Sequence, residues 1–182
     1  MRAEVSAVAF RLFAEQGFDK TTVEQIAAEA GLSRTTFFRY FGTKEDVVLD
    51  NLDELGRKVA AALTGRPAKE RPWVSLRRAF DVITQLAADA SGETLSLMRM
   101  LSENCSLKTR HWEKQQDWQS LLAPEVSRRL GADPDAAGDL RARALVASAL
   151  ACLDAATDTW AACDAAIPLP VLLDRAMGAL TE

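Results

Sequence analysis

One short segment, residues 34–41 (RTTFFRYF), carries side chains suited to binding a polyanion. In a helix, Phe37 and Phe41 are four residues apart and lie on one face. The opposite face then carries two arginines and no acidic residue: Arg34, Thr35, Phe38 and Arg39. Arginine can hydrogen-bond guanine through two nitrogens, and threonine and phenylalanine can pack on a thymine methyl group. We therefore predict that this face contacts base edges in the major groove of duplex DNA.

The alternative is that Phe38 is a second core residue and that Arg34 and Arg39 only face solvent. An exposed phenylalanine on so short a helix is unusual unless another molecule covers it. The sequence on either side of the segment favours the DNA interpretation.

The preceding segment predicts a helix-turn-helix motif. The second helix opens at Thr21 or Thr22, since each has a Glu or Gln three residues later, as a capping box requires. Gly31 makes the turn, and Ser33 caps the helix that follows. Two helices joined by a short turn that contains glycine are typical of this motif. A first helix over residues 2–16 precedes it.

The next helix is capped by Thr43 and has Lys44 in its first turn. Free backbone N–H groups and a lysine at a helix start form an anion site, which suits a DNA phosphate. The apolar pattern predicts one unbroken helix over residues 44–63, long enough to connect the DNA-binding part to the rest of the chain.

Residues 9–48 (AFRLFAEQGFDKTTVEQIAAEAGLSRTTFFRYFGTKEDVV) resemble the N-terminal region of the tetracycline-repressor (TetR) family of bacterial transcription regulators. The resemblance implies base or phosphate contacts at Arg34, Thr35, Thr36 and Phe38, and phosphate contacts at Thr22, Ser33, Tyr40 and Lys44. Thr35 and Phe38 depart from the family, which often has Gly or Ala at the first of these positions and Tyr at the second. No basic arm precedes the first helix, so a minor-groove contact is not expected.

The rest of the chain reads as helix without strand-like alternation, so we predict an all-α protein of about nine helices. Residues 64–72 form a polar loop with a glycine and two prolines. We divide the chain into a DNA-binding domain (1–46) and a ligand-binding and dimerisation domain (47–182), with helix 47–63 connecting them. A break or kink is expected at Pro124, and a long helix is expected to start at Asp133–Pro134.

One recognition helix contacts only a few bases, so specific binding predicts a homodimer on a pseudo-palindromic site. Small residues at helical spacing allow close helix approach, and an apolar stripe follows on the last helix. The resemblance implies a four-helix dimer interface here. The predicted interface residues are Ala144, Ser148, Ala151, Cys152, Ala155, Leu172, Leu173, Ala176, Met177 and Leu180. The alternative is that this stripe packs within its own chain.

An apolar cavity is expected among the fifth to eighth helices, and it would suit a lipophilic or aromatic effector. Its candidate lining residues are Trp73, Phe80, Ile83, Met98, Leu101, Asn104, Cys105, Trp112 and Trp118, with Arg99 and His111 as further polar anchors. The alternative for each is plain core packing. Because His111 and Trp112 are adjacent, at most one of them is expected to line the cavity.

The composition is that of a soluble chain: of 182 residues, 48% are hydrophobic and 26% are charged. The net charge is −4, so any positive charge for nucleic acid must be local. No apolar run approaches the roughly 20 residues of a membrane span, and no signal-peptide pattern occurs. We therefore expect a cytoplasmic protein with no membrane partner.

Cysteine and histidine usage argues against a metal, a cofactor or an enzyme. Cys105, Cys152 and Cys163 lie far apart without a C-x-x-C pair, and His111 is the only histidine. That excludes the usual zinc and disulfide frameworks, although redox sensing by one thiol stays open. A helical enzyme that used Cys105 or His111 would lack a base–nucleophile pair at a recognisable sequence spacing, and it would lack a phosphate-binding glycine loop.

These observations together predict a ligand-responsive transcriptional regulator, a repressor released from a palindromic operator by a small lipophilic or aromatic effector. Two alternatives remain: a helical protein-interaction module, and a DNA-binding regulator that needs no effector. Whether the protein represses or activates depends on where its operator lies, which the protein sequence does not encode.

Overall fold

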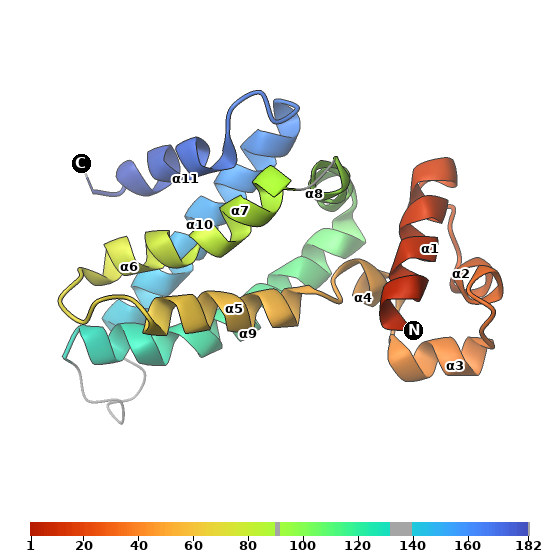
Figure 1. The fold of residues 1–182 in the computed structure, drawn as a ribbon, viewed down its shortest axis with the longest axis horizontal. Helices are drawn as coiled ribbons and strands as arrows, with labels where there is room; N and C mark the ends of the chain where they lie inside the picture. The colour runs from red at the N-terminus through yellow and green to blue at the C-terminus, as the bar shows by residue number, and fades with distance from the viewer. Residues whose placement is uncertain (90–91, 132–139, 182) are drawn as a thin grey trace.

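The computed structural model describes residues 1–89, 92–131 and 140–181. Regular structure within these residues is helical, which confirms the all-α prediction (Figure 1). The helices are α1 (Arg2–Gln16), α2 (Val23–Glu29), α3 (Arg34–Tyr40), α4 (Lys44–Val48), α5 (Leu52–Thr64), α6 (Pro72–Ala79), α7 (Asp81–Asp89), α8 (Glu93–Glu103), α9 (Cys105–Arg129), α10 (Leu140–Ala162) and α11 (Leu169–Gly178).

The described residues contain eleven helices instead of about nine because two predicted helices are each divided. The predicted helix 44–63 is interrupted at residues 49–51, where Leu49 turns into the core and its carbonyl accepts from Leu52 N at 3.0 Å. The helix predicted after Pro72 is interrupted at Phe80, which is also fully buried. In both places an apolar side chain at the break is held by the core, so the chain changes direction there.

Two further expectations concern prolines. The break expected at Pro124 is absent, since α9 runs through this residue. Pro124 and Ser120, whose carbonyl loses its usual N–H partner, are both exposed, so solvent can replace the missing bond. The helix start expected at Asp133–Pro134 lies outside the described residues.

Two hydrophobic cores organise the molecule. The first joins α1–α4 and includes Phe13, Ile26, Phe37 and Val47. The second lies among α5–α11. Leu107, at the start of α9, is buried in the first core, so the α1–α4 end docks on the corner between α8 and α9. Val47, Val48 and Leu49 also pack in the first core. The domain boundary predicted at 46/47 stays a prediction, and this packing favours placing it after Leu49.

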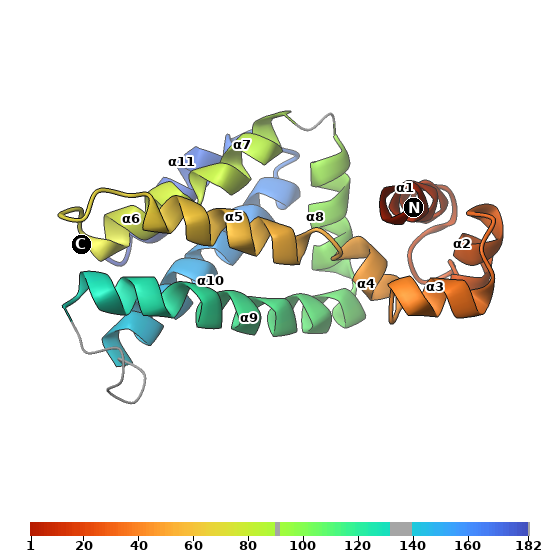
Figure 2. The same cartoon turned by 60° about the horizontal axis from the view of Figure 1, so that its bottom comes forward.

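Helices α5–α11 form the larger part of the molecule, and they pack in layers into an elongated shape (Figure 2). Helices α5 and α9 run side by side along its length and α10 crosses them, while α11 packs on α10. The close approach of α5 and α9 depends on Gly56, because a Cβ there would lie 2.5 Å from Trp118 Nε1. No side chain longer than hydrogen fits without moving the indole.

The loop between α5 and α6 is held by one buried arginine. The Arg129 side chain is 1% exposed and donates to the carbonyls of Leu63 (2.8 Å), Arg66 (2.9 Å) and Pro67 (2.9 Å). Its Nε donates to Glu125 at 2.8 Å. The guanidinium therefore binds the end of α5 and fixes the predicted loop, although the sequence analysis did not single this residue out.

Candidate nucleic-acid interface and ligand cavity

The α3 helix is anchored by aromatic residues on one face. Phe37 and Phe41 are buried, with ring centroids 5.5 Å apart, and Leu32 is half-buried beside them. Ser33 Oγ accepts from Thr36 N at 3.1 Å and caps the helix. This anchoring fixes the rotation of α3 about its own axis.

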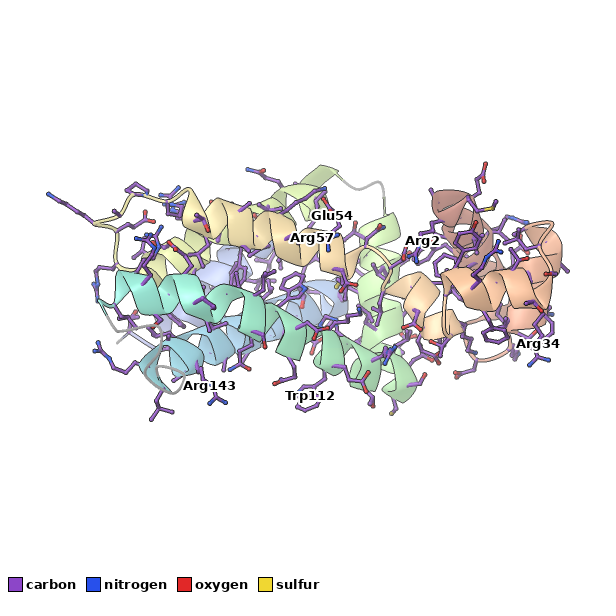
Figure 3. All side chains as sticks on the ribbon, turned by 90° about the horizontal axis from the view of Figure 1, so that it is seen from below. Arg2, Arg34, Glu54, Arg57, Trp112 and Arg143 are labelled. Atoms are coloured by element: carbon purple, nitrogen blue, oxygen red, sulfur yellow. The ribbon has the colours of Figure 1, made fainter. Side chains whose placement is uncertain are left out.

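The opposite face of α3 is exposed, as the spacing predicted. Arg34, Thr35 and Arg39 are exposed, and Phe38 keeps 43% of its surface accessible. Figure 3 shows Arg34 projecting from the far end of the molecule, away from α5–α11. The alternative in which Phe38 is a core residue is therefore wrong. Contact of this face with DNA stays a prediction.

Arg34 has two partners on its own surface. Its Nε lies 3.1 Å from Glu24 of α2, and its guanidinium lies 5.4 Å from the centre of the Phe38 ring. Both charged side chains are more than half exposed, so solvent screens the pair and a phosphate or guanine can displace Glu24. Arg39 stacks on the half-buried Tyr40 ring at 5.3 Å.

The start of α2 is decided between the two threonines. Thr22 Oγ1 accepts from Gln25 N at 3.2 Å, and Gln25 Oε1 accepts from Thr22 N at 2.8 Å. Thr21 is instead buried and donates to the Gly17 carbonyl at 2.8 Å. The capping box therefore belongs to Thr22, which stays exposed at the end of α2.

The predicted phosphate contact of Lys44 needs a correction. Its ammonium group donates to the carbonyls of Phe18 at 2.8 Å and Thr21 at 3.1 Å, and it lies 4.3 Å from the Phe18 ring centre. The side chain is long enough to reach back from α4 to the turn between α1 and α2. It therefore holds the α1–α4 core together, and backbone carbonyls already take the N–H donors that the phosphate prediction required.

A cavity of about 300 Å³ lies among α5, α7, α8, α9 and α10. Five of the predicted lining residues do line it: Ile83, Met98, Leu101, Trp112 and Trp118. His111 lines it together with Trp112, so the expectation that only one of the pair would is wrong.

Four predicted lining residues lie elsewhere. Phe80 is fully buried core, and Trp73 donates from Nε1 to the Met177 carbonyl at 3.3 Å. Asn104 donates to the Met100 carbonyl at 2.7 Å, and Cys105 is exposed at the start of α9. Arg99 forms an ion pair with Asp164 at a separate surface depression. Apolar or polar character alone did not separate these positions from the cavity wall.

The sequence reasoning missed most of the polar wall. The additional polar lining residues are Lys108, Lys114, Gln115, Asp154, Thr157 and Asp158. Gln115 Nε2 donates to Asp154 Oδ1, and His111 Nε2 lies 3.4 Å from the same oxygen. Nδ1 of the His111 ring is buried without a hydrogen-bond partner among the described residues. The available signal was the three- and four-residue spacing of polar positions on each helix: Lys108, His111 and Gln115 on α9, and Asp154, Thr157 and Asp158 on α10.

The predicted dimer surface divides into two groups. Ala144, Ala151 and Ala155 are exposed, as is Leu180, and Ser148 and Ala176 are partly exposed. Cys152, Leu172, Leu173 and Met177 are instead buried in the core of their own chain. Since α11 lies across α10 in the protomer, its apolar stripe is already covered. For these four residues, the alternative of packing within the chain is correct.

No group of three or more His, Cys, Asp or Glu side chains among the described residues could hold a metal ion. None of the described helices has the length and apolar character needed to cross a membrane.

The comparisons with known proteins cover both halves of the chain. Residues 6–50 match the model of the bacterial regulatory proteins of the tetR family, and residues 70–182 match that of the MftR C-terminal domain. TcmR, an HTH-type transcriptional regulator of Streptomyces glaucescens, is 32% identical over 152 residues, covering 80% of this chain and 66% of TcmR. MftR of Mycobacterium tuberculosis is 25% identical over 127 residues, covering 70% of this chain and 64% of MftR. The chain thus spans about two thirds of the length of either relative.

Solved structures support the same assignment. The crystal structure of Thermus thermophilus FadR, a TetR-family transcriptional repressor in complex with lauroyl-CoA, is 26% identical with a TM-score of 0.65. The match covers 100% of this chain and 94% of that one. Family models covering both halves, regulators among the relatives and a matching fold agree with the exposed α3 face. The chain therefore belongs to the TetR family of bacterial transcriptional regulators.

Proposed function

We propose that this protein is a ligand-responsive repressor that binds a pseudo-palindromic operator as a homodimer and leaves it when a small molecule fills the cavity. The observation that carries the proposal is the shared wall between cavity and DNA-binding core. Leu101 lines the cavity and is buried in the core of the DNA-binding end, while Leu52 and Met98 pack against both cores. A ligand at this wall is therefore one side chain away from the helices that carry α3.

On DNA, α3 would lie in the major groove with Arg34, Thr35, Phe38 and Arg39 toward the base edges. Thr22, Ser33, Thr36 and Tyr40 border this face at the ends of α2 and α3 and would contact phosphates. Glu24 contacts Arg34 through Nε, so the two terminal nitrogens of the guanidinium stay available to bind a guanine.

Dimerisation would use the exposed side of α10 with the end of α11. Ala144, Ala151 and Ala155 are small and exposed at helical spacing, so a second copy of α10 can approach closely. Leu180 is 60% exposed beyond α11 and adds an apolar side chain to the same surface. Two copies of α3 would then contact two half-sites.

The signal from the cavity would pass through Trp118. Its ring lines the cavity and lies on Gly56, and its Nε1 donates to the Leu52 carbonyl at 3.1 Å. Leu52 begins α5, directly after the break that separates α5 from α4. A ligand that prefers a shifted Trp118 would move the start of α5, and the α4 helix with it, because binding shifts the protein toward the state it fits best.

Two features of the relatives support the repressor and ligand parts. FadR of Thermus thermophilus is a repressor and holds lauroyl-CoA.

A regulator that binds chromosomal DNA acts in the bacterial cytoplasm, so this location belongs to the proposal.

The test begins with a duplex selected by the purified protein from a randomised pool, followed by binding measured by fluorescence anisotropy. A protein that contacts about 6–10 phosphates should lose affinity by roughly 10³-fold or more as the salt concentration rises from about 50 to about 200 mM. An affinity that does not change with salt concentration would refute DNA binding and favour a protein-interaction module. A panel of lipids and aromatic drugs is then titrated into the complex. If no compound changes the affinity, the ligand-sensing part is wrong while the DNA-binding part stands.

A further inference from the structure

We infer that the cavity selects an aromatic ligand that donates a hydrogen bond, through a hydroxyl or a protonated amine, to the carboxylate of Asp154. The inference rests on the proposed function, because it assumes that the cavity is the effector site. It excludes ligands whose polar end is itself a carboxylate.

The first observation is an acceptor with spare capacity on the cavity wall. Asp154 Oδ1 is bound by the Gln115 amide and approached by His111 Nε2. No described residue donates to Asp154 Oδ2, and the side chain stays 39% exposed where it lines the cavity. Gln115 and His111 hold the carboxylate by one oxygen and so fix the direction of the other. The free oxygen can accept a donor from a ligand.

The second observation is the balance of charge around the cavity. Lys114 is bound to Asp53, with Nζ 2.9 Å from each carboxylate oxygen. Among the described residues, that leaves Asp154 and Asp158 on the acidic side and Lys108 on the basic side. A ligand carboxylate would add a third negative charge to a wall on which Lys108 is the one remaining cation among the described residues, and like charges at close range repel. A neutral or cationic donor meets no such penalty.

The third observation is the pair of tryptophans. Trp118 is buried in the wall, whereas Trp112 is 61% exposed and projects outward from α9 at the edge of the molecule (Figure 3). An exposed tryptophan that lines a cavity offers a flat ring on which a second ring can stack. Tryptophan faces also attract ammonium groups. Aromatic walls beside an open carboxylate therefore suit a ring with a donor at one end.

The size of the space sets the scale of the probes. About 300 Å³ is the lower end of the range for cavities that take drug-sized ligands. Three naphthalenes that differ only in their polar group are suitable: 2-naphthylmethylamine, 2-naphthol and 2-naphthoate. Their ring is the same, so differences in affinity report on the polar group.

Binding of each probe to the full chain is measured by isothermal titration calorimetry at pH 7.5, without DNA. The amine and the naphthol should bind at least about tenfold more tightly than the naphthoate, and Asp154→Asn should remove most of that preference. Asp117→Asn is the matched control, since Asp117 is exposed on α9 and does not line the cavity. Trp112→Ala should weaken all three probes through lost stacking, and the amine most, because it also loses the attraction between its ammonium group and the ring.

Three outcomes would overturn the inference: naphthoate binding as tightly as the other two, an unchanged preference in Asp154→Asn, or no binding of any probe. Circular dichroism of each variant shows whether it is folded. Binding of the selected duplex is measured in parallel. If the protein binds the duplex and some other ligand releases it, only this ligand class is refuted. If the protein binds no duplex, the proposed function is refuted.

Discussion

At the scale of single residues, the exposed face of α3 is specified by its buried neighbours. Phe37 and Phe41 fix the rotation of the helix, and the side chains between them are left to solvent. The exposed residues of this face are not equivalent, because Arg34 already contacts Glu24 and the Phe38 ring. The contribution of Arg34 to base specificity therefore depends on its terminal nitrogens reaching a base while Glu24 stays at Nε.

Arg34→Ala tests base recognition. We expect operator affinity to fall by about 1–3 kcal/mol, with relaxed choice at the base it contacts. Measured affinities for the selected duplex and for its single-base variants check both effects. Arg11→Ala is the control, since Arg11 is exposed on α1 and paired with Glu29. An equal loss on every sequence would make Arg34 a phosphate contact.

Lys44→Met tests the corrected role of Lys44. The variant keeps an unbranched side chain of similar bulk but removes the ammonium group and its hydrogen bonds to Phe18 and Thr21. We expect the free energy of unfolding to fall by about 1–3 kcal/mol, with Lys20→Met, at an exposed lysine, as control. Urea unfolding followed by circular dichroism provides the measurement. Loss of DNA affinity with unchanged stability would restore the predicted phosphate contact.

At the scale of helices and loops, the connection between α5 and α6 shows how charged groups hold a polar segment. Arg66 donates a hydrogen bond to Glu70, which lowers the Glu70 pKa to about 2, and burial opposes this shift. Ser75 donates to the same carboxylate at 2.8 Å, and Arg129 adds its charge. The loop is therefore fixed by an ionised Glu70 as well as by the Arg129 guanidinium.

This loop predicts a dependence of stability on pH. A carboxyl whose pKa is lower in the folded than in the unfolded state stabilises the fold above its unfolded pKa, near 4.5 here. The contribution is then lost as the pH falls toward about 2. Glu70→Gln should lower the free energy of unfolding at pH 7 by about 1–3 kcal/mol, and the difference should shrink between pH 4.5 and 2. Urea midpoints test this, with the exposed Glu15→Gln expected to be neutral. A constant difference across this range would contradict it.

The contact between α5 and α9 predicts a coupling residue. Trp118→Phe keeps a ring on Gly56 but removes the donor to the Leu52 carbonyl. We expect the ratio of operator affinities without and with effector to fall at least about threefold. Trp73→Phe is a matched control because it also removes one indole–carbonyl hydrogen bond, far from the DNA-binding end. Anisotropy titrations measure the ratio. Equal effects of both substitutions would place the coupling elsewhere.

At the scale of the whole molecule, net charge and shape set how DNA is approached. The chain carries a net charge of −4, and its candidate DNA-binding face lies at one end of an elongated molecule. Specific binding therefore depends on local arginines and on the distance between two copies of α3. In the proposed dimer, that distance would be set at the other end of the protein by the exposed surface of α10.

Ala151→Glu tests the dimer. A glutamate on the exposed stripe of α10 places like charges opposite each other across a two-fold axis, so we expect monomers and a loss of operator affinity of at least about tenfold. Sedimentation velocity gives the oligomeric state. Ala61→Glu, at an exposed alanine on α5, should change neither. A monomeric wild-type chain that binds the duplex specifically would refute the dimer.

The sequence by itself determined the helical class, the rotation of α3 and the capping residues Ser33 and Thr43, but not the choice between Thr21 and Thr22. These depend on spacings of three and four residues within one helix, and helix geometry is the same wherever the helix lies. The resemblance of residues 9–48 to the TetR family was likewise readable, because that segment forms its own small core.

Only the tertiary structure decided what covers each face. Periodicity marked Leu172, Leu173 and Met177 as an apolar stripe but did not show that α10 of the same chain buries it. It placed Lys44 at a helix start without showing that its side chain reaches the turn after α1. The cavity wall is assembled from five helices, and Asp154 meets His111 and Gln115 from 39–43 positions away. Contacts between distant segments depend on how helices cross, which no local spacing encodes.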